Sequence, residues 1–215
     1  MWNDLEEPWK IAVEQAWDAY KGGTIPIGCV IMSQDGNIIS KGRNQVFDNG
    51  KGSSLAGTNM AHAEMNSMLG LNEIEHPDIR EYILYTTMEP CPMCFGTMVM
   101  MSIRNIKFGA RDGLAGAASL NDKLAYISRK RITVQRGAEE LEPFQLILQT
   151  AYEYEREHPR VDYILNTWRH VNNLAIDCGQ ELYNTRFFPQ AVKEGKEIGE
   201  VYDYVISYYK KRVKI

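Results

Sequence analysis

Residues 84 to 94 read Leu-Tyr-Thr-Thr-Met-Glu-Pro-Cys-Pro-Met-Cys. The apolar, β-branched and aromatic residues over 82 to 87 predict a buried strand, and a second run of this kind follows at 103 to 108. The two prolines predict a loop followed by a helix over about 92 to 101, because proline is favoured in the first turn of a helix. The two cysteines would then lie at the start of that helix, where the helix dipole favours thiolates.

Cys91 and Cys94 can bind one metal ion together, and His62 supplies a third ligand of a type that zinc prefers. A catalytic zinc site has three protein ligands and one open position for water. On a regular helix Glu64 would point about 200° away from His62, but in a first turn both side chains can line one cavity. We therefore expect His62 to face the metal and Glu64 to face its water, as a proton carrier and not as a ligand.

A Cys-x-x-Cys pair alone is also typical of structural zinc sites and redox pairs. A structural site would need a further Cys or His ligand from a second close pair, whereas Cys29 and Cys178 are isolated. A thioredoxin-like pair would follow the first strand of its unit, but this pair follows a later strand and is accompanied by a His-x-Glu sequence. The combined pattern favours a catalytic metal site, and Cys29 is expected to be a buried apolar residue.

His-x-Glu combined with Pro-Cys-x-x-Cys is the signature of zinc-dependent nucleobase deaminases. The chain resembles the cytidine deaminase superfamily, most closely its bacterial tRNA adenosine deaminase branch, over roughly residues 5 to 157. The matching segments are Ile25–Val30, Gly42–Asn44, Ala61–Glu64, Leu84–Cys94, Phe108–Asp112 and Gly116–Leu120. The resemblance implies an α/β fold, a three-layer α/β/α sandwich with a five-stranded mixed sheet. It also implies one Zn²⁺ per chain, with water or hydroxide as its fourth ligand.

The resemblance further implies a set of substrate contacts. Asn44 would contact the base or sugar, and the apolar wall that includes Ile27 would pack against the ring. Backbone groups near Ala63 and Glu89 would hydrogen-bond the ring edge. An Asx turn is an equal alternative for Asn44. The Arg-Asp pair at 111 and 112 either contacts the substrate or forms an ion pair that fixes its turn.

Helical and strand periodicities predict the remaining elements. We expect a helix over about 9 to 20, a hairpin with strands near 25 to 33 and 37 to 43, helices near 62 to 71, 119 to 127 and 138 to 157, a short strand near 131 to 134, and C-terminal helices around 160 to 183 and 190 to 211. The predicted organisation is a deaminase domain over 1–157 and a helical extension over 158–215 packed on it. The extension either caps the core, forms a dimer interface or closes a pocket with an aromatic such as Trp168, Phe187 or Phe188.

Composition indicates a globular protein of 215 residues, either one enlarged domain or a domain with a helical appendage. The sequence has no run of about 18 to 20 apolar residues that could cross a membrane, and its acidic start is unlike a signal peptide. Four cysteines, two of them in a metal motif, do not make a disulfide framework. We therefore expect a cytoplasmic protein with no membrane partner.

The distribution of charged residues along the sequence indicates which class of substrate the protein binds. Residues 1 to 157 hold 15 Lys and Arg against 21 Asp and Glu, a net of −6, and the remainder holds 9 against 7, a net of +2. A protein that binds several tRNA phosphates usually presents a basic surface, and the basic clusters here are confined to Arg129–Arg131 and Lys210–Arg212. The loop over 48 to 59 is also longer than in the tRNA-editing branch.

These features favour a hydrolytic deaminase that converts an amidine C–NH₂ of a free nucleobase, nucleoside or related heterocycle to C=O with release of ammonia. Zinc-bound hydroxide would be the nucleophile and Glu64 the proton shuttle. The alternative is a tRNA-specific adenosine deaminase that makes inosine at the wobble position. A catalytically inactive binding protein is a third possibility. The resemblance implies a homodimer, and the sequence does not indicate which ring is deaminated.

Overall fold

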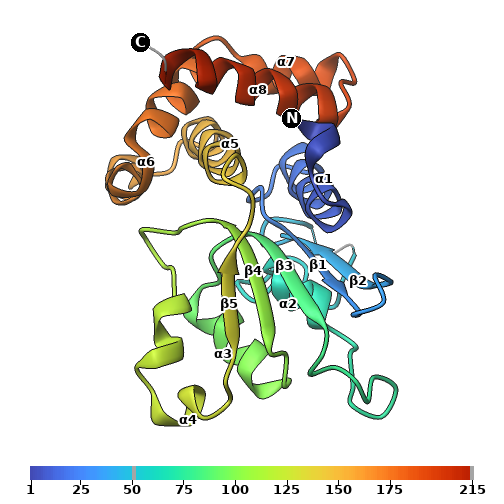
Figure 1. Cartoon of the computed structure of the whole chain (residues 1–215). Coiled ribbons are helices and arrows are strands. Elements are labelled where there is room, and N and C mark those ends of the chain that lie inside the picture. The colour runs from blue at the N-terminus through green and yellow to red at the C-terminus, as the bar shows by residue number, and fades with distance from the viewer. Residues whose placement is uncertain (50–51, 214–215) are drawn as a thin grey trace.

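A five-stranded mixed sheet forms the centre of the computed structural model, which describes residues 1–49 and 52–213 (Figure 1). Its strands are β1 (Gly28–Met32), β2 (Ile38–Arg43), β3 (Ile83–Met88), β4 (Asn105–Ala110) and β5 (Thr133–Arg136). The spatial order is β2-β1-β3-β4-β5; β1 is antiparallel to both neighbours, and β3, β4 and β5 are parallel. The mixed sheet predicted from the resemblance is therefore confirmed. Part of the loop expected over 48 to 59, residues 50 and 51, lies outside the described residues.

Helices cover both faces of this sheet. Those of the first 157 residues are α1 (Glu7–Lys21), α2 (Ala63–Met68), α3 (Pro92–Met100), α4 (Ala125–Ser128) and α5 (Leu141–Glu155). Successive strand residues face opposite sides of the sheet. Accordingly Val30 joins the core formed with α1 and α5, and Ile31 joins the core formed with α2 and α3. The three-layer α/β/α arrangement is confirmed.

The C-terminal helices form a further layer against α1 and α5, at the top of Figure 1. They are α6 (Val161–Asn184), α7 (Phe187–Lys193) and α8 (Ile198–Val213), and their buried residues join the core of α1 and α5. The single helix expected over 190 to 211 is two helices, separated by a turn in which Gly195 has a φ of +66°, a conformation that glycine adopts readily. The helix expected over 119 to 127 is likewise divided, into a 3₁₀ helix (Ala118–Asp122) and α4. Within the described ranges, every helix is too short or too polar to span a bilayer.

Strand β2 and helix α2 approach each other most closely at Gly42. A Cβ atom at this position would lie 2.4 Å from the carbonyl oxygen of Ala63 and 2.6 Å from the backbone nitrogen of Ser67. Both are backbone atoms of α2, so a side chain at position 42 would push the helix away from the sheet. Gly42 therefore sets the position of the α2 start, which carries His62 and Glu64.

Replacement Gly42→Ala is expected to lower the free energy of unfolding by about 1–3 kcal/mol, the usual cost of overpacking, and to weaken zinc binding because α2 shifts. Urea unfolding and a metal titration measure the two effects. Gly96→Ala is the control, because its Cβ would meet no atom within 4 Å and alanine is favoured within a helix. Equal stability of the two variants would contradict the close approach of α2 to β2.

Candidate active site

The starts of α2 and α3 bring three metal-binding side chains together. His62 is the N-terminal cap of α2 and Cys91 is that of α3, both with extended backbone, and Cys94 lies in the first turn of α3. Because α3 directly follows β3, the two cysteines lie at the carboxyl end of that strand. The ligand atoms of all three residues lie within 4.8 Å of one another.

Their spacing fits a tetrahedral zinc ion. His62 Nδ1 lies 3.6 Å from Cys91 Sγ and 3.5 Å from Cys94 Sγ. Zinc bonds of about 2.0 Å to nitrogen and about 2.3 Å to sulfur, meeting at a tetrahedral angle, would place the two atoms roughly 3.5 Å apart. One imidazole and two thiols are also a donor set that zinc prefers. The three residues therefore suit a zinc site both in chemistry and in spacing.

The two cysteines differ in acidity. The hydrogen bond from Cys94, supported by one from His62, lowers the pKa of Cys91 to about 4. The same hydrogen bond, together with burial, raises the pKa of Cys94 well above its usual range. The pair therefore holds one proton between two sulfurs, and metal binding would release it because zinc is bound by thiolates.

Glu64 lies beside the three ligand candidates and is only 3% exposed. Its Oε2 accepts a hydrogen bond from Cys94 Sγ over 3.5 Å. Burial raises the pKa of the Glu64 carboxyl, and the charge of His62 opposes this effect. A carboxyl group beside the ligand candidates can serve as an acid/base, and Glu64 has that position.

A cavity of about 200 Å³ adjoins these residues. One side is formed by residues of the α2 and α3 starts and the other by residues of α5 and α6, with apolar residues from the strand ends between them. Its lining residues are Ile25, Ile27, His62, Glu64, Met88, Glu89, Cys91, Asp112, Leu114, Ala115, Gln149, Glu153, Arg156, Ile164 and Trp168. Since α2 and α5 lie on opposite faces of the sheet, the cavity spans the sheet's end.

Trp168 is the aromatic residue of the C-terminal helices that reaches this cavity. Its Nε1 donates a hydrogen bond to Asp112 Oδ1 over 2.9 Å. The Glu89 carboxylate in turn accepts a hydrogen bond of 3.1 Å from the Asp112 backbone N–H, which holds the segment after β4 in place. Phe187 and Phe188, the other aromatic candidates, belong to the apolar cluster of α1 and α8 and do not line the cavity.

Asn44 is buried and forms the Asx turn that was the alternative to a substrate contact. Its Oδ1 accepts hydrogen bonds from the backbone N–H of Val46 (3.0 Å), which forms an Asx turn, and from Thr24 Oγ1 (2.8 Å). Its Nδ2 has no hydrogen-bond partner among the described residues. Asn44 is outside the lining of the cavity, so its contact with a substrate stays a prediction.

Only some of the other residues expected to contact the substrate line the cavity. Ile27 and Glu89 line the cavity, whereas Ala63 is buried at the start of α2 and is outside the lining. The Glu89 backbone N–H donates to the Ala110 carbonyl over 2.7 Å, and the two oxygens of the Glu89 carboxylate accept hydrogen bonds of 3.1 Å from the backbone N–H groups of Asp112 and Ala118. Of the Arg-Asp pair, Asp112 lines the cavity, while Arg111 forms an ion pair with a carboxylate of α5.

Two polar lining residues of α5 and the arginine directly after this helix were missed by the sequence reasoning. Gln149, Glu153 and Arg156 face the cavity, and Gln145 precedes them on the same side of the helix. The available signal was the recurrence of buried polar residues every four positions in an otherwise apolar helix. That spacing places these residues on one face of the helix. Only the fold shows that this face lines the cavity.

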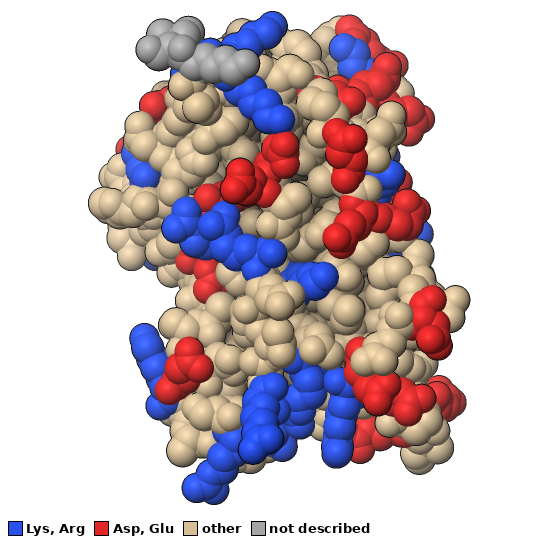
Figure 2. Space-filling model, in the orientation of Figure 1, with Lys and Arg blue, Asp and Glu red and all other residues tan. Residues whose placement is uncertain are grey.

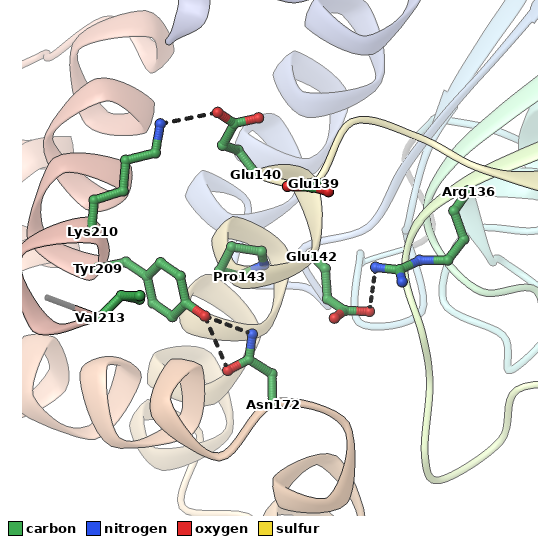
Figure 3. Close-up of a pocket in the computed structure, with 9 residues that line it drawn as sticks. All are labelled: Arg136, Glu139, Glu140, Glu142, Pro143, Asn172, Tyr209, Lys210 and Val213. Atoms are coloured by element: carbon green, nitrogen blue, oxygen red, sulfur yellow. Dashed lines mark hydrogen bonds and ion pairs between the residues drawn. The ribbon is translucent and has the colours of Figure 1, made fainter.

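A larger cavity, of about 460 Å³, lies between the start of α5, the middle of α6 and the end of α8 (Figure 3). It is bordered by the ion pairs Arg136–Glu142 and Lys210–Glu140 and by a hydrogen bond between Asn172 and Tyr209. Its lining contains none of the zinc-ligand candidates. The donor set, and not the size of a cavity, therefore identifies the site.

Comparison with known proteins gives matches over the part of the chain that carries this site. Residues 3–110 match the family described as the cytidine and deoxycytidylate deaminase zinc-binding region. A cytosine deaminase of Candida albicans is 28% identical over 115 residues, covering 54% of this chain and 69% of that protein. A tRNA-specific adenosine deaminase of Haemophilus influenzae is 34% identical over 113 residues, covering 52% of this chain and 61% of that protein. In another curated relative the match spans only 24% of the protein's length.

The fold is also similar to that of solved structures. A crystal structure of a protein in complex with 2,6-diaminopurine has a TM-score of 0.53 and 20% sequence identity. The similarity covers 70% of this chain and 83% of that protein. At this level of identity the comparison bears on the fold alone.

Proposed function

Because the chain belongs to the family of the cytidine and deoxycytidylate deaminase zinc-binding region, we propose that it is a zinc-dependent hydrolytic deaminase of a small heterocycle. The reaction converts an amidine C–NH₂ of a free base, nucleoside or related ring to C=O and releases ammonia. The observation that carries the proposal is the small cavity that joins His62, Cys91 and Glu64 to α5 and α6. Pockets for drug-sized ligands usually measure roughly 300–1,000 Å³, so this cavity suits one ring system.

In this proposal His62, Cys91 and Cys94 hold one zinc ion, whose remaining position is open to water. When bound, zinc supplies a water nucleophile near neutral pH, because it lowers the pKa of a bound water to about 7. Glu64 would receive one proton of that water and pass it to the ring nitrogen next to the attacked carbon. It would then take the proton of the added hydroxyl group and give it to the amino group, which leaves as ammonia while C=O forms.

The remaining assignments concern substrate contacts and organisation. Asn44 Nδ2 donates to an acceptor on the ring, and Ile27 packs on the ring face. Backbone groups of Ala63 and Glu89 form hydrogen bonds with the ring edge. The catalytic domain comprises residues 1–157, with 158–215 as an extension that supplies Trp168 to the cavity. The protein forms a homodimer, which sedimentation analysis tests.

The distribution of charge supports a small substrate. Basic side chains gather at the lower end of the molecule, over α4 and the starts of β4 and β5 (Figure 2). Arg129–Arg131 lie there, directly before β5. Cys91 and Cys94 follow β3, and β3, β4 and β5 are parallel, so the basic cluster and the site lie at opposite ends of the sheet. Six strand residues separate such ends by about 20 Å.

Replacement of all three residues of this basic cluster by alanine is therefore expected to leave ammonia release from a small ring unchanged. If this cluster bound tRNA, the triple variant would bind tRNA more weakly than the wild type, and its binding would depend less on salt concentration. Steady-state rates and a salt titration of tRNA binding measure the two quantities. A strong loss of turnover in the triple variant would contradict the separation of the cluster from the site.

Ammonia release by the zinc-loaded protein tests the proposed function. The panel comprises free bases, their nucleosides and nucleotides, pterin-like rings, and a tRNA with adenosine at the wobble position. Release from one or more small rings is the expected result. Release from tRNA alone would replace the proposal by the second candidate, and zinc binding without turnover on any of these would leave only a binding protein.

The second candidate is wobble-adenosine editing of tRNA. The observation that favours it is the 34% identity with a tRNA-specific adenosine deaminase over about half of the chain. Conversion of adenosine to inosine in the tRNA, detected after nuclease digestion, would support it.

A further inference from the structure

A continuous row of polar side chains runs along the face of α5 that meets the cavity. Gln145 Nε2 donates to the Pro26 carbonyl (2.8 Å) and to Gln149 Oε1 (3.2 Å), and Gln149 Nε2 donates to Glu153 Oε1 (3.4 Å). Arg156 Nε donates to Glu153 Oε2 over 2.7 Å. The row therefore ends in a buried carboxylate, Glu153, that also lines the cavity.

Glu153 retains capacity to accept hydrogen bonds. A carboxylate offers about four acceptor positions, and Glu153 uses one short bond on Oε2 and one long bond on Oε1. Arg156 is held in place on its other sides by the rings of Phe47 and Tyr152, each 5.6 Å from its guanidinium carbon. The carboxylate is thus positioned before any ligand enters, and it can accept a further hydrogen bond from a ligand.

The charged side chains that line the cavity disfavour anionic ligands. Its described lining contains the carboxyl groups of Glu64, Glu89, Asp112 and Glu153 and a single guanidinium, Arg156, which is already paired with Glu153. A phosphate on the α5 side of this cavity would face carboxylates, and the guanidinium there is already paired. An uncharged ring with N–H groups would instead find acceptors.

Glu153 and the zinc residues lie on opposite sides of this cavity, since α5 and α2 cover opposite faces of the sheet. A ring whose amidine carbon faces His62, Cys91 and Glu64 therefore presents its far edge to Glu153. In a free base such as cytosine, the nitrogen that would carry a sugar, N1, bears a hydrogen and lies opposite the amidine carbon, C4. In a nucleoside, a nucleotide or tRNA the same nitrogen is substituted and has no hydrogen to donate.

We propose that Glu153 is a specificity-determining residue that accepts the N–H of the unsubstituted ring nitrogen, so that the substrate is a free base and not a nucleoside, a nucleotide or tRNA. This inference rests on the proposed deaminase function. A site that hydrogen-bonds a substrate N–H strongly rejects analogues that lack it, because its own polar group is left unpaired. The small cavity adds a steric barrier to a sugar.

The test compares kcat and KM of the zinc-loaded protein for each free base and its nucleoside, in the wild type and in Glu153→Gln. We expect the wild type to prefer a free base roughly 100-fold or more. Glu153→Gln should lower kcat/KM for the base roughly 10- to 100-fold, mainly through KM, because a charged hydrogen bond is lost; the nucleoside rate should change little. Glu155→Gln is the matched control, because Glu155 is on the same helix, accepts a hydrogen bond from Tyr20 and is outside the cavity lining.

The outcomes separate this inference from the proposed function. Ammonia release that favours a nucleoside or tRNA in the wild type would overturn the role of Glu153 and leave deamination standing. An unchanged ratio of base to nucleoside activity in Glu153→Gln would also overturn the role of Glu153 and leave deamination standing. No ammonia from any ring would overturn both. Should Glu153→Gln fail to fold, the wild-type selectivity alone decides.

Discussion

Glu64→Gln is expected to lower the rate of ammonia release roughly 10²- to 10⁴-fold, the usual contribution of a positioned acid/base, while the protein keeps its zinc. Glutamine has nearly the shape of glutamate, so the packing of this buried position beside Cys94 is retained. It cannot take up the proton of water or hand it to the ring. Steady-state ammonia release and the zinc content of the purified variant measure the two halves of the prediction.

Zinc content is the internal control for this experiment, because it separates a catalytic role from a ligand role. Loss of zinc together with activity would make Glu64 part of the metal site. Substantial turnover with full zinc occupancy would eliminate Glu64 as the proton carrier.

Cys94→Ala is expected to abolish both zinc binding and turnover. Cys94 is fully buried and its sulfur lies 3.5 Å from His62 Nδ1, so the remaining two ligands leave an incomplete site. A metal site in a folded protein also stabilises it, because the unfolded chain does not hold the ion in the same way. Chelation should therefore lower the unfolding temperature of the wild type and have no effect on that of Cys94→Ala.

Cys178→Ala is the matched control. Cys178 is also a buried free cysteine, but it lies on α6 among apolar residues and away from the other three cysteines. This variant should keep its zinc, its turnover and its response to the chelator. Full zinc occupancy in Cys94→Ala would contradict the ligand set.

The sequence predicted the parts of the site that are encoded by neighbouring residues. Proline before and after Cys91 indicates a helix start, which explains why the two cysteines converge. His62 and Glu64, two residues apart, share a cavity only because the helix begins between them, and this was foreseeable from helix geometry. The strands around these motifs followed from their apolar and β-branched runs.

The opposite wall of the cavity could not be predicted in this way. Gln149 and Glu153 lie in a helix that is buried over residues 141 to 153, and nothing local indicates that its polar row meets the zinc residues. Trp168 comes from a helix beyond the matched family region, and it was one of three aromatic candidates. Their roles depend on how α5 and α6 pack across the sheet, which is a long-range property of the chain.

The apolar pattern of the sequence also wrongly predicted one continuous helix near the C-terminus. Residues 190 to 211 have a helical apolar pattern throughout, but Gly195 adopts a positive φ and turns the chain back. The resulting α8 packs against α5 and α6 and so helps to fix the wall that carries Glu153.

The central claim, hydrolytic deamination of a small ring at the His62, Cys91 and Cys94 site, is tested most directly by turnover in ¹⁸O-labelled water. The zinc-loaded protein is incubated with the free-base panel and with tRNA, and ammonia and product mass are measured together. The account predicts one labelled oxygen in the product for each ammonia released from a small ring, and a far lower rate in Glu64→Gln. Ammonia from tRNA alone, an unlabelled product or an undiminished rate in Glu64→Gln would contradict it.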